Sequence, residues 1–149
     1  MVKVVATNKK AFHDYHILEK VEAGIMLVGT EVKSLRAGGV QMRDAYASPR
    51  GGELYLNNLH ISVYSHGNIQ NHDPLRPRKL LLHKKELKKF IDMATQKGLT
   101  LLALRIYFKK DYAKVELGVG RGKKLHDKRE ALKRKAMERD SEREYRIKH

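Results

Sequence analysis

Three His-Asp doublets are the residues of this 149-residue sequence whose types and spacing come closest to catalytic machinery. They are His13-Asp14, His72-Asp73 and His126-Asp127. Imidazole and carboxylate groups hold the metal in many phosphohydrolases, but such sites need ligands that converge from a rigid framework. The doublets fall near an entry strand, in a loop and at the start of a basic segment. We therefore expect no enzyme, no metal and no cofactor, and keep a phosphodiesterase only as a rival hypothesis.

Positive charge is the stronger chemical signal. The chain carries 32 Lys and Arg against 17 Asp and Glu, a net charge of +15, which attracts polyanions. Five tyrosines are available for stacking on bases, and the glycines of GRGKK would let a phosphate backbone approach closely. The cations cluster in NKKA (8–11), KSLR (33–36), RPRK (76–79), the lysines of HKKELKK (83–89) and GRGKK (120–124), and the tyrosines are Tyr15, Tyr46, Tyr64, Tyr107 and Tyr112. Together these features predict nucleic-acid binding.

Other classes of protein are disfavoured by what the sequence lacks. There is no cysteine, which excludes disulfides and thiolate metal sites. No stretch approaches the roughly 20 apolar residues that cross a bilayer, and the first ten residues lack the apolar centre of a signal peptide. No P-loop, dinucleotide fingerprint or nucleophile elbow occurs. We expect a soluble cytoplasmic protein with no membrane partner.

Short strands dominate the predicted elements that must position these cations. Ordered structure is expected to begin near Phe12, and an alternating run at 53–64 slips by one at Asn57-Asn58, which predicts a bulge. Residues 65–79 have no apolar periodicity and are predicted to form the longest internal loop. The segment 99–120 reads as the strongest hairpin, with β-branched and aromatic residues on both arms.

Two helices interrupt these strands. Thr30 is predicted to cap a short helix over 30–37 that ends at Gly38-Gly39. A second helix before the final hairpin has apolar residues at i, i+3, i+4 and i+7 and ends at Gly98. Two helices are too few to provide the crossover connections of a parallel α/β sheet. The fold class is therefore mainly β: a small antiparallel barrel of about six strands, resembling the oligonucleotide-binding (OB) type, with two or three short helices over residues 1–120.

Residues 121–149 have a different composition. They contain 12 Lys and Arg, 6 Asp and Glu, and few apolar side chains, so they cannot bury enough surface to order themselves alone. Helix-forming residues are frequent, and Glu130 precedes Arg134 by four positions, which supports a helix once a polyanion screens the repulsion. We predict a basic C-terminal tail that is disordered when free and folds on binding.

A series of motifs in fixed order resembles one family. The motifs are NKKAFHDY, VEAGIMLVGTEVKSLRAG, RPRKLLLHKKEL, TLLALRIYFKKDYAKVELGVGRGKK and HDKRE, which run from Asn8 to about Arg129. They are similar to those of the SmpB family, the SsrA-binding proteins. The resemblance implies an OB-like barrel that binds the tRNA-like domain of transfer-messenger RNA (tmRNA, or SsrA RNA) in bacterial trans-translation.

The resemblance also implies partners beyond tmRNA. The family delivers alanyl-tmRNA, charged by alanyl-tRNA synthetase, to stalled ribosomes together with EF-Tu and GTP. Its tail, helical on the ribosome, enters the empty decoding centre and messenger channel of the small subunit, against ribosomal RNA. The main alternative is a ribosomal or initiation-factor-like OB protein that binds ribosomal RNA permanently, and affinity for free tmRNA would separate the two.

The same resemblance assigns candidate site residues. Asn8, Glu22 and Leu81 match family residues implicated in tmRNA binding. Glu22 is expected to accept hydrogen bonds from a base edge or a 2′-hydroxyl, or to hold a neighbouring cation in place. We add five nearby cations as weaker candidates for positioning phosphates: Lys9, Lys10, Arg36, Arg78 and Lys79. The residues expected to contact the decoding centre are Lys123, Lys124, His126, Asp127, Lys128 and Arg129.

Overall fold

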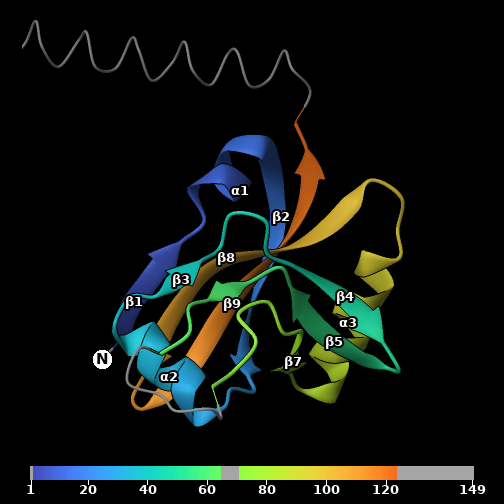
Figure 1. Ribbon diagram of the computed structural model, residues 1–149. Helices are drawn as coiled ribbons and strands as arrows, with labels where there is room; N and C mark the ends of the chain where they lie inside the picture. The colour runs from blue at the N-terminus through green and yellow to red at the C-terminus, as the bar shows by residue number, and fades with distance from the viewer. Residues whose placement is uncertain (1, 65–70, 124–149) are drawn as a thin grey trace, which may run out of the picture.

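A computed structural model of the chain describes residues 2–64 and 71–123. Its elements in chain order are β1 (Val2–Thr7), α1 (Lys9–Asp14), β2 (Tyr15–Ile25), α2 (Gly29–Arg36), β3 (Val40–Gln41), β4 (Tyr46–Arg50), β5 (Glu53–Asn57), β6 (His60–Ile61), β7 (Arg78–Leu81), α3 (Lys84–Ala94), β8 (Leu99–Lys109) and β9 (Tyr112–Gly122). Figure 1 shows the helices arranged around the strands of the main sheet.

The main sheet closes on itself. Its strand order is β1-β8-β4-β5-β7-β2-β9, every pairing is antiparallel, and an additional β8–β9 pairing joins the two ends of a six-stranded ring. β1 lies outside the ring and pairs with the second half of β8, while β3 and β6 form a separate two-stranded sheet. Closure leaves few free edges. The predicted fold class, a mainly β barrel of about six strands with two or three helices, is confirmed.

The hairpin β8–β9 contributes to two hydrophobic clusters, because both faces of β8 are covered. The inner face joins the main core, which includes Ala103, Ile106 and, from β9, Leu117. The outer face carries Leu102 and Leu104, which pack with Ala11 of α1 in a small second cluster. A register shift between Ala103 and Arg105 accommodates this change of face. Helix α1 is thereby fixed against the outside of the barrel.

The helices follow the predicted periodicity closely. Gly38 has φ of +81° after α2, as a left-handed helix stop requires. α3 contacts β4, β5 and β8 and buries Phe90 against the core. The cap of α2 differs from the prediction: Val28 is the N-cap, its N–H donates to Glu31 Oε1 at 2.9 Å, and the Thr30 hydroxyl lies 2.8 Å from His72 Nδ1 instead. In the described part of the chain, no helix is long and apolar enough to cross a membrane.

Three boundaries differ from the sequence prediction. Structure begins with β1 and α1 rather than near Phe12. The sequence did not reveal β1, because it is an edge strand whose partner is about a hundred residues away. Asn57-Asn58 is not a bulge: Asn58 has φ of +58°, and the chain leaves the main sheet there to form β6. The predicted loop 65–79 ends early, since β7 begins at Arg78 and pairs with β5 and β2.

Candidate RNA-binding surface

An open groove brings together two of the predicted site residues, Glu22 of β2 and Leu81 of β7. β2 and β7 pair so that Gly24 lies opposite Leu81, and a Cβ at Gly24 would stand 3.3 Å from the Leu81 Cβ. The glycine therefore leaves room for the leucine side chain, which is 49% exposed. We call this hollow the Glu22–Leu81 groove; its lining residues are Glu22, Gly24, Leu81, Leu82, His83 and Lys114.

Glu22 is held as a carboxylate by neighbours that sequence reasoning did not link to it. The Tyr107 hydroxyl donates a hydrogen bond to Glu22 Oε2, and Lys109 Nζ lies 3.6 Å from Oε1. The Tyr107 hydrogen bond is the main reason that the pKa of Glu22 is lowered, and burial together with this carboxylate raises the pKa of Tyr107. An ionised carboxylate with free lone pairs can accept hydrogen bonds from RNA but donates none.

Asn8 is buried, and its side chain is occupied within the protein. It is the N-cap of α1: Oδ1 accepts from the Ala11 N–H at 3.1 Å. Nδ2 donates to the carbonyl oxygens of Met42 at 3.0 Å and Ala103 at 2.9 Å. With all three of these hydrogen bonds satisfied and only 3% of the residue exposed, Asn8 ties α1 to β8 and to the segment before β4.

Four of the proposed phosphate-positioning cations reach the surface, on different sides of the barrel. Lys9 is exposed on α1, and Lys10 beside it pairs with Asp44 at 3.3 Å. Arg36 of α2 stacks over the Phe108 ring, 4.5 Å from its centroid. Lys79 lies two positions before Leu81 on β7 and therefore points to the same outer face as the groove. An exposed ion pair such as Lys10–Asp44 contributes little stability, so Lys10 can exchange Asp44 for a phosphate.

Arg78 requires a correction. Its side chain is fully buried, as is that of Glu31, and Arg78 Nε donates to Glu31 Oε2. The remaining guanidinium nitrogens donate to the carbonyl oxygens of Leu59 at 2.7 Å and Pro74 at 3.1 Å. A phosphate cannot reach a guanidinium so enclosed. We reassign Arg78 from a phosphate-positioning cation to a core residue that joins α2, β7 and the segment before β7.

Of the residues expected at the decoding centre, only Lys123 lies within the described part of the chain. β9 continues to Gly122, past the predicted end of the barrel at residue 120, and the Lys123 N–H donates to the Asp14 carbonyl at 2.8 Å. Figure 1 shows this end of β9 (orange) beside α1. Outside the described residues lie Lys124, His126, Asp127, Lys128 and Arg129.

The two His-Asp doublets that the structure describes do not form a common site, since each makes its own local contacts. His13 Nδ1 lies 2.8 Å from its own neighbour Asp14, and His72 spends both ring nitrogens on Thr30 and the Ile61 carbonyl. Among residues 2–64 and 71–123, no three His, Cys, Asp or Glu side chains gather as a metal site would need. His126-Asp127 falls outside these ranges. The described residues give the phosphodiesterase hypothesis no support.

A closed antiparallel barrel with a basic surface and a groove that combines a carboxylate with apolar side chains defines a class: small RNA-binding proteins of the OB-like type. Comparison with known proteins narrows this class. The SmpB protein family matches residues 5–147. The SsrA-binding protein of Carboxydothermus hydrogenoformans is 53% identical over 149 residues, all of both chains. That of Geotalea uraniireducens is 56% identical over 138 residues, 93% of this chain and 91% of its own.

A solved structure agrees with these relatives. A chain of the structure described as "tmRNA-SmpB: a journey to the center of the bacterial ribosome" superposes with a TM-score of 0.71 at 54% identity, covering 87% of this chain and 94% of that one. This chain therefore belongs to the SmpB family. Membership confirms the resemblance seen in the motifs and places the chain among non-enzymatic RNA-binding proteins, not among ribosomal or initiation-factor-like ones.

Proposed function

We propose that this chain binds tmRNA and the ribosome and serves as the RNA-binding adaptor of trans-translation, which rescues stalled ribosomes. The observation that carries the proposal is the SmpB family match over residues 5–147, supported by full-length relatives named as SsrA-binding proteins. The net charge of +15 supplies the sequence-independent attraction to RNA that such an adaptor needs.

The Glu22–Leu81 groove is our proposed contact for the tRNA-like domain of tmRNA. Counterion release alone gives affinity without selectivity, so selection needs groups that read RNA through hydrogen bonds and apolar contact. The Glu22 carboxylate is anchored by Tyr107 and can accept from a 2′-hydroxyl or a base edge, and Leu81 supplies exposed apolar surface beside it. Lys79 and Lys114 add nearby charge for phosphates.

The finer parts of the proposal concern the basic C-terminal segment, predicted as 121–149, and the other partners. Because β9 runs to Gly122, the tail is taken from here on as residues 124–149. We assign them the role of a tail that is disordered when free, becomes helical on the ribosome and lies against small-subunit ribosomal RNA in the decoding centre. Their charge and low apolar content support this role. EF-Tu with GTP and alanyl-tRNA synthetase act on the complex through tmRNA, and the protein works in the cytoplasm.

Competition binding tests the proposed selectivity. Labelled tmRNA bound to the chain is displaced with unlabelled tmRNA or an elongator tRNA at roughly physiological salt, where the screening length is about 8 Å. We expect tmRNA to compete far better. Equal competition by both RNAs, with steep salt dependence, would contradict the adaptor and leave a general basic RNA-binding barrel.

Variants of the groove identify the part of the surface that selects. Leu81→Ala is expected to weaken tmRNA binding by about 1 kcal/mol, roughly five-fold, because about half of the leucine is available for burial. Leu75→Ala is the matched control, since Leu75 is 53% exposed but lies outside the groove. If the two variants bind tmRNA equally well, the groove is not the selecting surface.

A further inference from the structure

A second hollow lies at the α1 side of the barrel, well separated from the Glu22–Leu81 groove. Its walls come from α1, the start of β2 and the entry to β4, and its volume is about 210 Å³. Tyr15 begins β2 and Glu22 lies seven residues further along, so the two hollows are roughly 20 Å apart along this strand. Six residues define what we call the Tyr15–Tyr46 pocket: Lys10, Tyr15, Arg43, Asp44, Tyr46 and Leu102.

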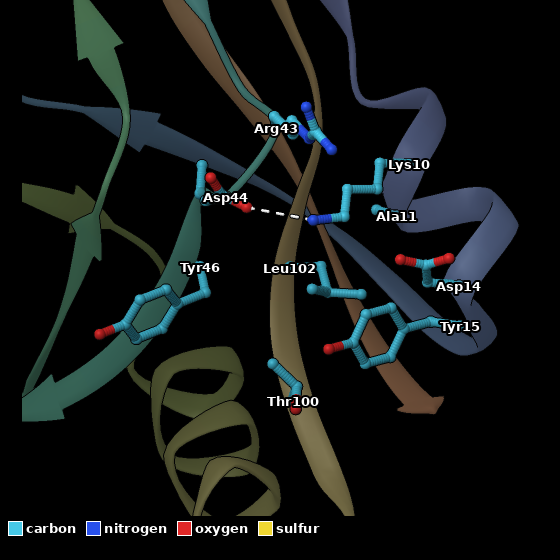
Figure 2. Close-up of a pocket in the computed structure, with 10 residues that line it drawn as sticks. Lys10, Ala11, Asp14, Tyr15, Arg43, Asp44, Tyr46, Thr100 and Leu102 are labelled. Atoms are coloured by element: carbon cyan, nitrogen blue, oxygen red, sulfur yellow. Dashed lines mark hydrogen bonds and ion pairs between the residues drawn. The ribbon is translucent and has the colours of Figure 1, made fainter. Parts of the chain in front are cut away.

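Two aromatic rings flank this pocket. Figure 2 shows Tyr46 and Tyr15 on its two sides, with Leu102 and Thr100 of β8 between them. Tyr46 is 39% exposed although its neighbours Ala45 and Ala47 are buried, so the strand presents a phenol ring to solvent at this point. Leu102, 6% exposed, gives the floor an apolar surface. An apolar floor between two phenol rings suits a planar aromatic ligand.

The backbone of β9 makes room for Tyr15. A Cβ added at Gly120 would stand 2.8 Å from Leu102 Cδ1 and 3.0 Å from Tyr15 Cβ, closer than ordinary contacts. Glycine at 120 therefore lets both side chains settle onto the strand and sets the depth of the pocket. Gly120 belongs to the GRGKK run that sequence analysis interpreted as an RNA contact, and its structural role here is to shape the floor.

Buried hydrogen bonds hold the opposite walls in place. The Asn8 amide joins α1 to the Met42 carbonyl, two residues before the wall residue Asp44, and to the Ala103 carbonyl next to the floor. At the surface, Lys10 of α1 pairs with Asp44 across the pocket at 3.3 Å, as Figure 2 shows. Asn8 is thus a positioning residue for this pocket, although it has no exposed polar atom of its own to offer RNA.

We propose that the Tyr15–Tyr46 pocket receives one unpaired nucleobase of an RNA ligand, stacked on the Tyr46 ring, with the flanking phosphate near Arg43 and Lys10. The inference rests on the proposed function, because it takes RNA binding as given. Exposed aromatic rings beside cations are how proteins hold single unpaired nucleotides. The Lys10–Asp44 pair is half-exposed and weak, so Lys10 can turn to a phosphate and leave Asp44 to accept from a base amino group.

A tryptophan reporter tests the pocket directly, since the chain contains no tryptophan. Tyr46→Trp keeps a large ring for stacking, and a base that stacks on it quenches its fluorescence. Val63→Trp is the control: Val63 is 52% exposed and lines neither the Tyr15–Tyr46 pocket nor the Glu22–Leu81 groove. When RNA binds, we expect the fluorescence of the Tyr46→Trp variant to be quenched and that of the control variant to stay unchanged.

The source of the base is distinguished by adding RNA in two steps. Quenching by tmRNA alone identifies a tmRNA base, and quenching only after ribosomes are added identifies a ribosomal RNA base. Either outcome supports the pocket. No quenching in either step, while labelled tmRNA still binds the variant, would overturn the proposal and leave the proposed function intact. If the wild-type chain shows no preference for tmRNA over an elongator tRNA, the proposed function is contradicted instead.

Affinity provides an independent readout. Tyr46→Ala should weaken binding of the RNA that supplies the base by about 5- to 140-fold, the equivalent of the 1–3 kcal/mol that base–aromatic stacking provides. Tyr46→Phe keeps the ring and should bind as wild type does. Thermal melting of each variant verifies that it is folded. Wild-type affinity in a folded Tyr46→Ala variant, for both tmRNA and the ribosome, would refute the stacking role.

Discussion

The reassignment of Arg78 to the core predicts that Arg78→Met destabilises the fold and leaves RNA recognition unchanged. The substitution removes one of the two arginine partners of the buried Glu31 and one donor each to the carbonyl groups of Leu59 and Pro74, while Arg76 still pairs with Glu31 Oε1 at 2.6 Å. Removing one partner of a buried ion pair costs about 3–5 kcal/mol, and because Arg76 stays beside Glu31 we expect the lower end of this range, about 3 kcal/mol. At roughly 4 °C per kcal/mol for a domain of this size, we expect Tm to fall by about 12 °C.

A double variant separates the ion pair from general damage to the core. Glu31→Leu combined with Arg78→Met removes both buried charges, so its loss of stability should be smaller than the sum of the two single variants. Lys89→Met is the matched control for Arg78→Met. Lys89 also pairs with a carboxylate, that of Glu19, but the lysine side chain is 52% exposed, and we expect a loss below about 1 kcal/mol.

Urea unfolding at low temperature is the assay, since it keeps even a weakened variant folded at the start of the titration. tmRNA affinity is measured on the same samples before urea is added. The reasoning is refuted if Arg78→Met is no less stable than Lys89→Met. It is also refuted if the folded variant loses tmRNA affinity as a surface cation would, with a smaller dependence of binding on salt.

Three further predictions follow from the described contacts. Asn8→Ala should lower the free energy of unfolding by about 2–4 kcal/mol, since it removes a helix cap and two buried hydrogen bonds, those to the Met42 and Ala103 carbonyls; unchanged stability in urea would contradict this role. Tyr107→Phe should raise the pKa of Glu22, which NMR titration measures, and should weaken tmRNA binding. In a variant that already carries Glu22→Gln, adding Tyr107→Phe should weaken binding no further. Burial alone would raise the pKa of Glu31, but its hydrogen bonds lower it below the ordinary value of 4.5, so its stabilising effect is complete above about pH 4.5 and is lost as pH falls through the folded pKa. Urea unfolding across this pH range should show that loss in the wild type and less of it in Glu31→Gln.

Local patterns in the sequence identified the elements whose partners lie nearby. The amphipathic spacing of Leu87 and Phe90 predicted α3, and the β-branched arms around Lys109 and Lys110 predicted the β8–β9 hairpin. The helix and the hairpin both form through contacts between residues close in sequence and through packing on the main core. β1 was missed because its one partner among the described strands, β8, is distant in sequence, and half-exposed strands at an edge carry little periodicity.

The candidate site was harder to predict, because its geometry depends on pairs that are distant in sequence. RPRK has the composition of a solvated basic loop, and nothing near it indicates that Arg78 meets Glu31, 47 positions away. Glu22 and Leu81 were predicted from family motifs, and only the β2–β7 pairing shows that they share a groove. Tyr107 is one of five tyrosines counted as available for stacking, and only the structure shows that it is buried and that its hydroxyl donates to Glu22.

The account is tested most directly by tagging on stalled ribosomes. A reconstituted translation system that lacks its own SsrA-binding protein is given a messenger without a stop codon, together with tmRNA, EF-Tu and alanyl-tRNA synthetase. With the wild-type chain we predict tagged product. With a variant that lacks residues 124–149, we predict tmRNA binding close to that of the wild type and no tagging. No tagging by the wild-type chain would contradict the proposed function, and normal tagging by the truncated chain would contradict the role assigned to the tail.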